Sequence, residues 1–204
     1  MDMINKKVML GSVIVLGIGS LIGCHRNTPE EVDNTELSHV NEKSSSSNSY
    51  NTSSFNDLEV SVEEAIALYQ EQYPDSDLIK INLEESRGQI YYEMEGVDDE
   101  KEYELKINAQ TKKIDQVRSE KLESSERNGT KRANEKLNLE NLLSISEIID
   151  RAIEEYPDGT ISGLELDREL NSTYWELEID HNLLSSNSLK IDAQTGVILE
   201  TERD

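Results

Sequence analysis

The sequence of 204 residues contains 43 acidic and 20 basic side chains, which give it a formal net charge of −23. This charge argues against a nucleic-acid partner, because Lys and Arg provide the affinity for phosphates, and against a protein that lies flat on an anionic bilayer. It favours cations or basic partners, unless it serves only to keep the surface solvated. Because Cys24 is the only cysteine, an intramolecular disulfide and a cysteine-based metal site are excluded.

The N-terminal residues have the pattern of an export signal. Two lysines precede an apolar run over residues 8–21, which contains glycine and serine and is shorter than the roughly 20 residues of a membrane span. The run closes on Leu21-Ile22-Gly23-Cys24, which resembles the lipobox of bacterial lipoproteins. The resemblance implies a signal peptide over residues 1–23, an acyl lipid such as palmitate on Cys24, and a place on the outer face of a bacterial cytoplasmic membrane. The composition, rich in Asn, Lys, Ser, Ile and Glu, points to a Gram-positive source.

Residues 24–57 have the composition of a tether. They are rich in Ser, Asn and Thr, most plainly at 44–49, and contain few apolar residues. Such a segment cannot bury enough surface to offset the entropy of the chain, so we expect it to be disordered and to lift the folded part away from the membrane.

The remaining sequence contains an internal repeat. Four blocks recur in the same order, three at an offset of 83 residues and the last at 84, and seven of the ten positions in the last block are identical. Chance does not keep four blocks in register. The blocks are 61–66 and 144–149, 73–75 and 156–158, 91–95 and 174–178, and 105–114 and 189–198.

Each copy begins with a predicted helix. Ser61 with Glu64, and Ser144 with Glu147, match the capping box, in which the two side chains satisfy free backbone amides at a helix start. Apolar residues then recur at helical spacing. A Tyr-Pro pair ends each helix, because the residue before proline is driven out of helical geometry.

Alternating apolar and polar residues predict strands after each helix. Turns are expected at Arg87-Gly88 and at Asn171-Ser172. Trp175 lies in phase with the apolar strand residues, which predicts that it belongs to the core. The apolar strand positions are Ile79, Ile81, Leu83, Ile90, Tyr92, Met94, Tyr103, Leu105 and Ile107 in the first copy, and Leu164, Leu166, Trp175, Leu177, Ile179, Leu189 and Ile191 in the second.

These elements predict an α+β fold of two repeated units at 58–118 and 144–204, joined by a charged linker at 119–143. Each unit would be one helix packed on an antiparallel meander of three to four strands. The sequence leaves open whether the two units pack sheet to sheet or move separately on the linker.

The repeated residues resemble the PepSY domain. The resemblance covers about 61–118 and 144–202, and it rests on the Tyr-Pro-Asp block, the Tyr-Trp-Glu-Leu-Glu block and the Leu-Lys-Ile-Asp-Ala-Gln-Thr-Gly-Val-Ile block. The first copy departs from the pattern with Asn108 and Lys112, where Asp and Gly are preferred. The resemblance implies a module on the outer face of bacterial membranes, or in propeptides of thermolysin-type metalloproteases, that restrains peptidase activity. It carries no catalytic residues.

No motif of an enzyme accompanies this pattern. Zinc-protease, nucleophile-elbow and phosphate-loop motifs are missing from the sequence. His181 is the only histidine outside the tether, and we expect it to be an exposed loop residue. The sequence therefore predicts no enzyme, no catalytic residue and no cofactor. Calcium is the one ligand with suitable residues, because Asp75-Ser76-Asp77, and Asp98-Asp99-Glu100 with Glu102, place carboxylates on predicted loops. Neither cluster matches an EF-hand loop, and solvated acidic loops are the favoured explanation of both.

The sequence predicts a lipid-anchored extracytoplasmic protein that binds and regulates a secreted or wall-associated peptidase. An extended peptide would add to an unpaired outer strand. The alternative is a non-inhibitory sensor or interaction subunit of a membrane complex, with a possible response to cations.

Overall fold

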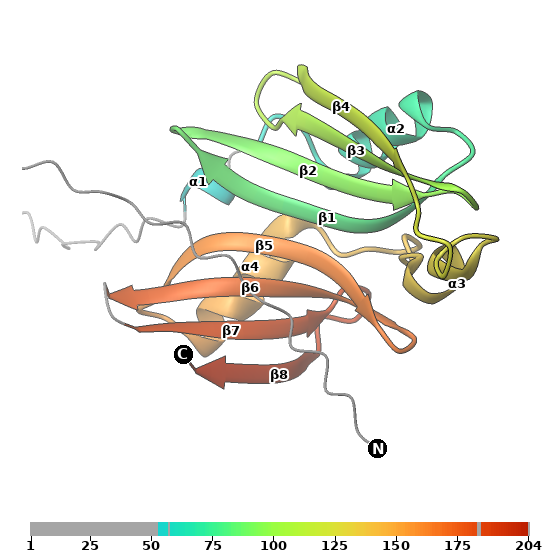
Figure 1. Ribbon diagram of the computed structural model, residues 1–204. Coiled ribbons are helices and arrows are strands. Elements are labelled where there is room, and N and C mark those ends of the chain that lie inside the picture. The colour runs from blue at the N-terminus through green and yellow to red at the C-terminus, as the bar shows by residue number, and fades with distance from the viewer. Residues whose placement is uncertain (1–52, 57, 183–184, 204) are drawn as a thin grey trace, which may run out of the picture. The chain divides into compact units, whose positions relative to one another are not determined.

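The computed structural model describes residues 53–56, 58–182 and 185–203 (Figure 1). Cys24, the predicted signal peptide and most of the predicted tether lie outside these residues. The described helices are α1 (Ser53–Asn56), α2 (Val62–Gln72), α3 (Thr130–Glu135) and α4 (Ile145–Glu155). The strands are β1 (Asp77–Ser86), β2 (Gln89–Val97), β3 (Lys101–Asn108), β4 (Ile114–Lys121), β5 (Thr160–Glu169), β6 (Ser172–Asn182), β7 (Ser185–Asp192) and β8 (Ile198–Arg203).

All eight strands form one antiparallel sheet in the order β4-β3-β2-β1-β5-β6-β7-β8. The expectation of two separate units, each with its own meander of three to four strands, is therefore wrong. The two meanders join edge to edge, rather than packing face to face or moving apart. We refer to β1–β4 with α2 as the first half and to β5–β8 with α4 as the second half.

The pairing of β1 with β5 joins the halves. Residues 81–84 of β1 lie opposite residues 163–166 of β5. Lys80 adds an ion pair across the joint to Glu165 at 2.8 Å. Both strands begin a meander, so each has a free edge of backbone amides and carbonyls that the other can satisfy. Apolar alternation in the sequence identifies the buried face of a strand but not the partner at its edge, which explains why this joint was missed.

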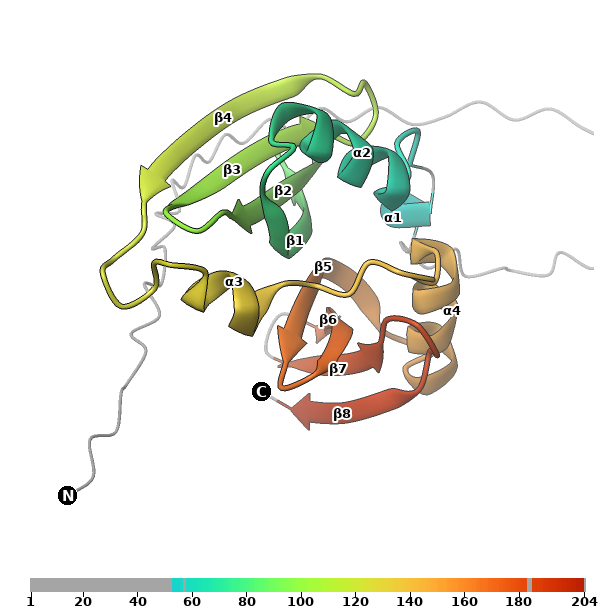
Figure 2. The same ribbon diagram turned by 90° about the vertical axis from the view of Figure 1, so that its right-hand side faces the viewer.

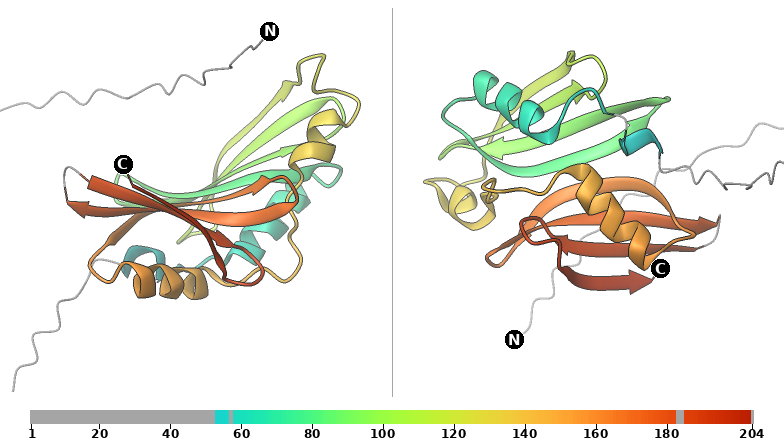
Figure 3. Two further views of the ribbon diagram at one scale, coloured as in Figure 1. Left: turned by 90° about the horizontal axis from the view of Figure 1, so that it is seen from below. Right: turned by 180° about the vertical axis from the view of Figure 1, so that it is seen from behind.

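Both long helices cover the same face of the sheet (Figure 3). The predicted capping boxes are confirmed, since Ser61 and Ser144 each accept from a backbone amide while Glu64 and Glu147 bond back. Their apolar sides join the sheet in a continuous core that includes Trp175, which is fully buried as predicted. Phe55 of α1 is also buried in this core.

A bulge in β1 creates a second, smaller core on the opposite face. The register of β1 against β2 shifts between Leu78 and Lys80, so Leu78 joins the main core. Ile79, which the alternation placed beside Ile81, instead packs with Val97 and Leu122. The segment after β4 thus returns to the sheet, and α3 lies near the joint of β1 and β5 (Figure 2).

The hairpin turns follow local sequence closely. Arg87 and Gly88 both have positive φ in the first hairpin, as the predicted turn requires. In the second hairpin Glu169 pairs with Ser172, so the turn residues are Leu170 and Asn171, one position earlier than expected.

Candidate functional site

The sheet face opposite α2 and α4 is polar, and we call it the open face. Alternate strand residues point to it, and carboxylates outnumber bases. Its acids include Glu84, Glu93, Glu95, Glu102, Glu104, Glu165, Asp167, Glu176, Glu178 and Glu200, and its bases are Lys80, Lys106, Arg118 and Lys190.

Each base of the open face is paired with a carboxylate across neighbouring strands. Lys106 of β3 pairs with Glu93 of β2, and Lys190 of β7 lies 2.9 Å from Glu200 of β8. Arg118 approaches Glu104 at 3.6 Å. Because these bases are already engaged, the excess negative charge belongs to the remaining carboxylates and is available to a basic partner.

Two carboxylates of the open face have a raised pKa, because burial disfavours their charged form. Burial raises the pKa of Glu84 above its usual value, and the neighbouring charge of Glu93 adds to this effect. Burial likewise raises the pKa of Glu95, although Lys80 works against it. The open face therefore concentrates negative charge that a cationic group would stabilise.

The sheet has two outer strands, β4 and β8, each paired along one side only within the described residues. Apolar side chains are exposed on both: Ile114 and Val117 on β4, and Ile198 and Leu199 on β8. A free strand edge can pair with an extended peptide. These edges are where the predicted mode of peptide binding is geometrically possible.

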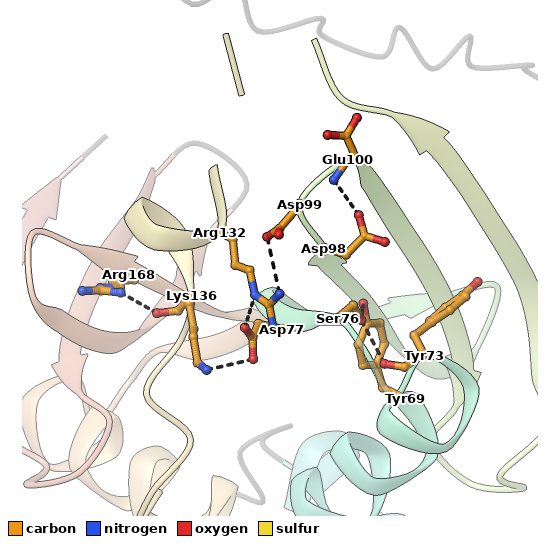
Figure 4. Close-up of polar contacts among 10 residues, drawn as sticks. All are labelled: Tyr69, Tyr73, Ser76, Asp77, Asp98, Asp99, Glu100, Arg132, Lys136 and Arg168. Atoms are coloured by element: carbon orange, nitrogen blue, oxygen red, sulfur yellow. Dashed lines mark hydrogen bonds and ion pairs between the residues drawn. The ribbon is translucent and has the colours of Figure 1, made fainter. Parts of the chain in front are cut away.

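In the first predicted cation cluster, basic side chains of the protein itself already bind Asp77. The Asp77 carboxylate accepts from Arg132 of α3 and lies 2.9 Å from Lys136 (Figure 4). Burial alone would raise the pKa of Asp77, but the hydrogen bonds from Lys136 and Arg132 outweigh it and lower the pKa below its usual value. Arg132 also reaches Asp99 at 3.5 Å. The structure thus brings Asp77 and Asp99 together around a guanidinium.

The second predicted cluster organises its own loop. Asp98 accepts from the backbone amides of Glu100 and Lys101, each at 2.7 Å, and from the Tyr103 hydroxyl at 2.6 Å. Burial would raise the pKa of Asp98, but the Tyr103 hydroxyl and these amides lower it. Glu102 pairs with Lys131. The carboxylates therefore close the β2–β3 turn and hold α3 beside it.

No group of three or more His, Cys, Asp or Glu side chains in the described part of the chain is placed to hold a metal ion. Among residues 53–56, 58–182 and 185–203, no helix combines the length and apolarity of a membrane span. His181 is exposed, as predicted, but lies near the end of β6 rather than in a loop.

No motif in the sequence pointed to Arg132 and Lys136 as the partners of Asp77. They lie more than 50 residues along the chain from it, within the predicted linker. Only a charge pattern was visible there, and charge alone does not identify a distant partner.

Comparison with known proteins identifies the family. The profile of PepSY, described as the peptidase propeptide and YPEB domain, matches residues 59–114 and 142–202. The chain belongs to the PepSY family. Its two matches span α2 to the start of β4 and the approach to α4 through β8, so the PepSY motif lies in both halves of the sheet.

One solved structure shares the fold of this chain. A crystal structure of a candidate lipoprotein from Clostridium difficile 630 is similar over 72% of this chain and 95% of its own, with 32% sequence identity and a TM-score of 0.69. The YpmB protein from Bacillus subtilis covers 70% of this chain and 98% of its own at 16% identity, but its TM-score of 0.30 carries no structural argument. A comparison with curated proteins gave no match.

The PepSY motif itself has a structural role. Asp192 accepts from the backbone amides of Gln194 and Thr195, and Gly196 follows with a positive φ. In the first half Asn108 accepts from the equivalent amides, and Lys112 takes the positive φ. The departures from the family pattern therefore preserve the turn, and the motif shapes the β3–β4 and β7–β8 connections.

Proposed function

We propose that this PepSY protein is a lipid-anchored, extracytoplasmic and non-enzymatic regulator of a secreted or wall-associated peptidase. Family membership is the observation that carries the proposal, because the PepSY description itself names peptidase propeptides. The similar candidate lipoprotein supports anchoring through Cys24.

The surface of the protein is suited to binding. The open face carries more carboxylates than bases, and the outer edges of β4 and β8 offer backbone groups to an extended segment of a partner. Main-chain hydrogen bonds along a strand edge give affinity, and the side chains beside them give selectivity. A peptidase is a suitable partner because its substrate cleft already accepts extended chains.

The test combines capture with inhibition. Intact cells carrying the lipidated protein are crosslinked, and a Cys24→Ala variant reports contacts that depend on anchoring. The chain from residue 24 onward, carrying Cys24→Ser, is then added to each captured peptidase. We expect dose-dependent inhibition.

Edge variants make the assay specific. Proline at Ser119 in β4, or at Thr201 in β8, should weaken inhibition if that edge binds the peptidase. These residues alternate with the ones that are hydrogen-bonded to β3 and β7, so their N–H groups point to the free edge, and proline removes them. Capture of a membrane complex, with no effect on any extracellular peptidase, would reject the regulator and favour the sensor subunit.

A further inference from the structure

The outer edge of β4 carries a row of outward-facing backbone groups. β4 is the last strand on its side of the sheet, and no other described strand pairs with that edge (Figure 2). The N–H groups of Val117, Ser119 and Lys121 point outward, because these residues alternate with those hydrogen-bonded to β3. The side chain of Val117 is also 51% exposed. Such an edge is a template on which another strand can pair.

The joint of β1 and β5 shows that equivalent strands of this fold pair with each other. By the offset of 83 residues in the repeat, Asn82 of β1 is equivalent to Glu165 of β5, and these two residues lie opposite each other. Ile81 lies opposite Leu166, which is the equivalent of Leu83. The pairing therefore reads the same from either strand, as in a two-fold contact between identical strands. β4 can meet β4 of a second copy in the same manner.

The side chains of β4 complement themselves in one such register. With the two-fold axis beside Ser119, Arg118 lies opposite Glu120 of the second copy, and symmetry repeats this ion pair. These residues form a non-hydrogen-bonded pair, in which side chains lie closest. Val117 lies opposite Lys121 of the second copy, whose aliphatic stem covers the exposed valine. A shift by two residues in either direction would place Arg118 or Glu120 opposite its own copy, so like charges exclude the neighbouring registers.

The charge near β4 also suits contact between two strongly acidic molecules. Residues 112–121 contain four bases and two acids, whereas the whole chain contains 20 bases and 43 acids. The side chain of Arg118 is 66% exposed even though Glu104 lies 3.6 Å from it, so it can also engage Glu120 of a second copy. Pairing through β4 therefore avoids the repulsion that most of the surface would produce.

The other outer strand, β8, does not complement itself. It carries Glu200 and Glu202 against a single base, and pairing with its own copy about Thr201 would place the two glutamates opposite each other. Pairing of β4 with β8 of another copy would not close, and it would continue from molecule to molecule. A closed two-fold dimer is thus built through β4 alone.

We propose that two copies of this protein form a dimer in which their β4 strands pair antiparallel and extend one sheet across both molecules. The contact involves one strand from each copy, so we expect a dissociation constant of about 10–1,000 μM in solution. Anchoring of both copies in one membrane, which is part of the proposed function, would raise their local concentration. The dimer goes beyond peptidase regulation and leaves the β8 edge of each copy free for a partner.

Sedimentation equilibrium tests the dimer on the chain from residue 24 onward with Cys24→Ser. We expect an equilibrium of monomer and dimer, without larger species, at concentrations up to about 1 mM. Arg118→Glu and Glu120→Arg, each made alone, should weaken dimerisation by about tenfold, because each places like charges opposite each other. The double variant that carries both substitutions exchanges the charges and should restore the dimer.

The controls separate this contact from other causes of association. Arg118 and Glu120 are exposed, and circular dichroism checks that each variant is folded. Glu200→Arg, on β8, should leave the equilibrium unchanged. A monomer at every concentration, or a double variant that stays monomeric, would overturn the proposal. Growth beyond a dimer that Glu200→Arg abolishes would overturn it in favour of pairing between β4 and β8. Inhibition of a peptidase is measured separately, so failure of the dimer does not count against the proposed function.

Discussion

At the scale of residues, the two halves fill equivalent parts of their cores with large and small side chains at opposite positions. Tyr69 lies across Gly96 and bonds Ser76 at 2.9 Å in the first half. The repeat aligns these three residues with Ala152, Ile179 and Gly159, and Ile179 lies against Gly159. A large helix residue over a strand glycine in one half is thus replaced by a small helix residue beside a strand isoleucine in the other. Cores tolerate such paired, volume-conserving substitutions far better than a single substitution that changes the volume.

Gly96→Ala should therefore destabilise the protein by about 1–3 kcal/mol, because overpacking forces neighbouring groups to move. An added Cβ would lie only 2.0 Å from the Tyr69 hydroxyl and 2.7 Å from the Asp77 carbonyl oxygen. Urea unfolding measures the change. Gly163→Ala is the matched control, since the nearest atom to its added Cβ is 4.0 Å away, and we expect a change within about 0.5 kcal/mol. Equal effects of the two substitutions would contradict this view of the core.

Leu170 is strained at the tip of the β5–β6 hairpin. It has a φ of 56° and is 88% exposed, so its side chain gains nothing from burial. The left-handed conformation costs an ordinary side chain roughly 1–2 kcal/mol, whereas asparagine tolerates it. Leu170→Asn should raise the unfolding midpoint in thermal denaturation. A lower midpoint would mean that Leu170 has a packing role that its exposure does not reveal.

At the scale of elements, the segment between β4 and α4 fastens the two halves. Arg132 and Lys136 engage Asp77 at the start of β1, and the backbone amide of Leu137 donates to the Leu78 carbonyl. Arg168 of β5 donates to the Lys136 carbonyl at 2.7 Å (Figure 4). This segment therefore contacts both strands of the joint.

Asp77→Asn should lower the free energy of unfolding by about 1 kcal/mol near pH 7, because it weakens two partly exposed ion pairs. The folded-state pKa of Asp77 is lowered, so its stabilisation is present above the unfolded pKa and is lost as the pH falls through the folded pKa. The difference between wild type and variant should thus shrink from about pH 5 downward. Urea unfolding across this range measures it, and a difference that stays constant with pH would reject the ion-pair explanation.

At the scale of the whole molecule, the continuous sheet makes one folding unit of the two halves. The residues of the main core come from both halves, from Phe55 of α1 to Ala193 after β7. Exposure of β1 or β5 alone would leave a bare strand edge, which is a site for aggregation.

Unfolding should therefore be cooperative across the joint. Leu164→Ala, in β5 of the second half, should lower hydrogen-exchange protection of β3 as much as that of β7, by about 2–5 kcal/mol. Leu164 is 1% exposed and lies opposite Leu83 of β1. Mass spectrometry of exchanged amides compares the two strands. Loss of protection confined to the second half would show that the halves unfold separately.

The sequence by itself determined the local features: the capping boxes at Ser61 and Ser144, the buried position of Trp175, and the family pattern. Each depends on contacts a few residues apart or on the period of one strand, and such information lies along the chain. Even so, the bulge at Leu78 moved Ile79 to the opposite face, because one extra residue reverses the alternation.

Only the tertiary structure decided that one sheet replaces two, that Arg132 engages Asp77, and that β4 and β8 form the outer edges of the sheet. The pairing of β1 with β5 depends on backbone N–H and C=O groups at two free strand edges. Nearly every residue has these groups, so no pattern of side chains predicts the pairing. Ion pairs likewise depend on residues that are distant in sequence and adjacent only after the chain has folded.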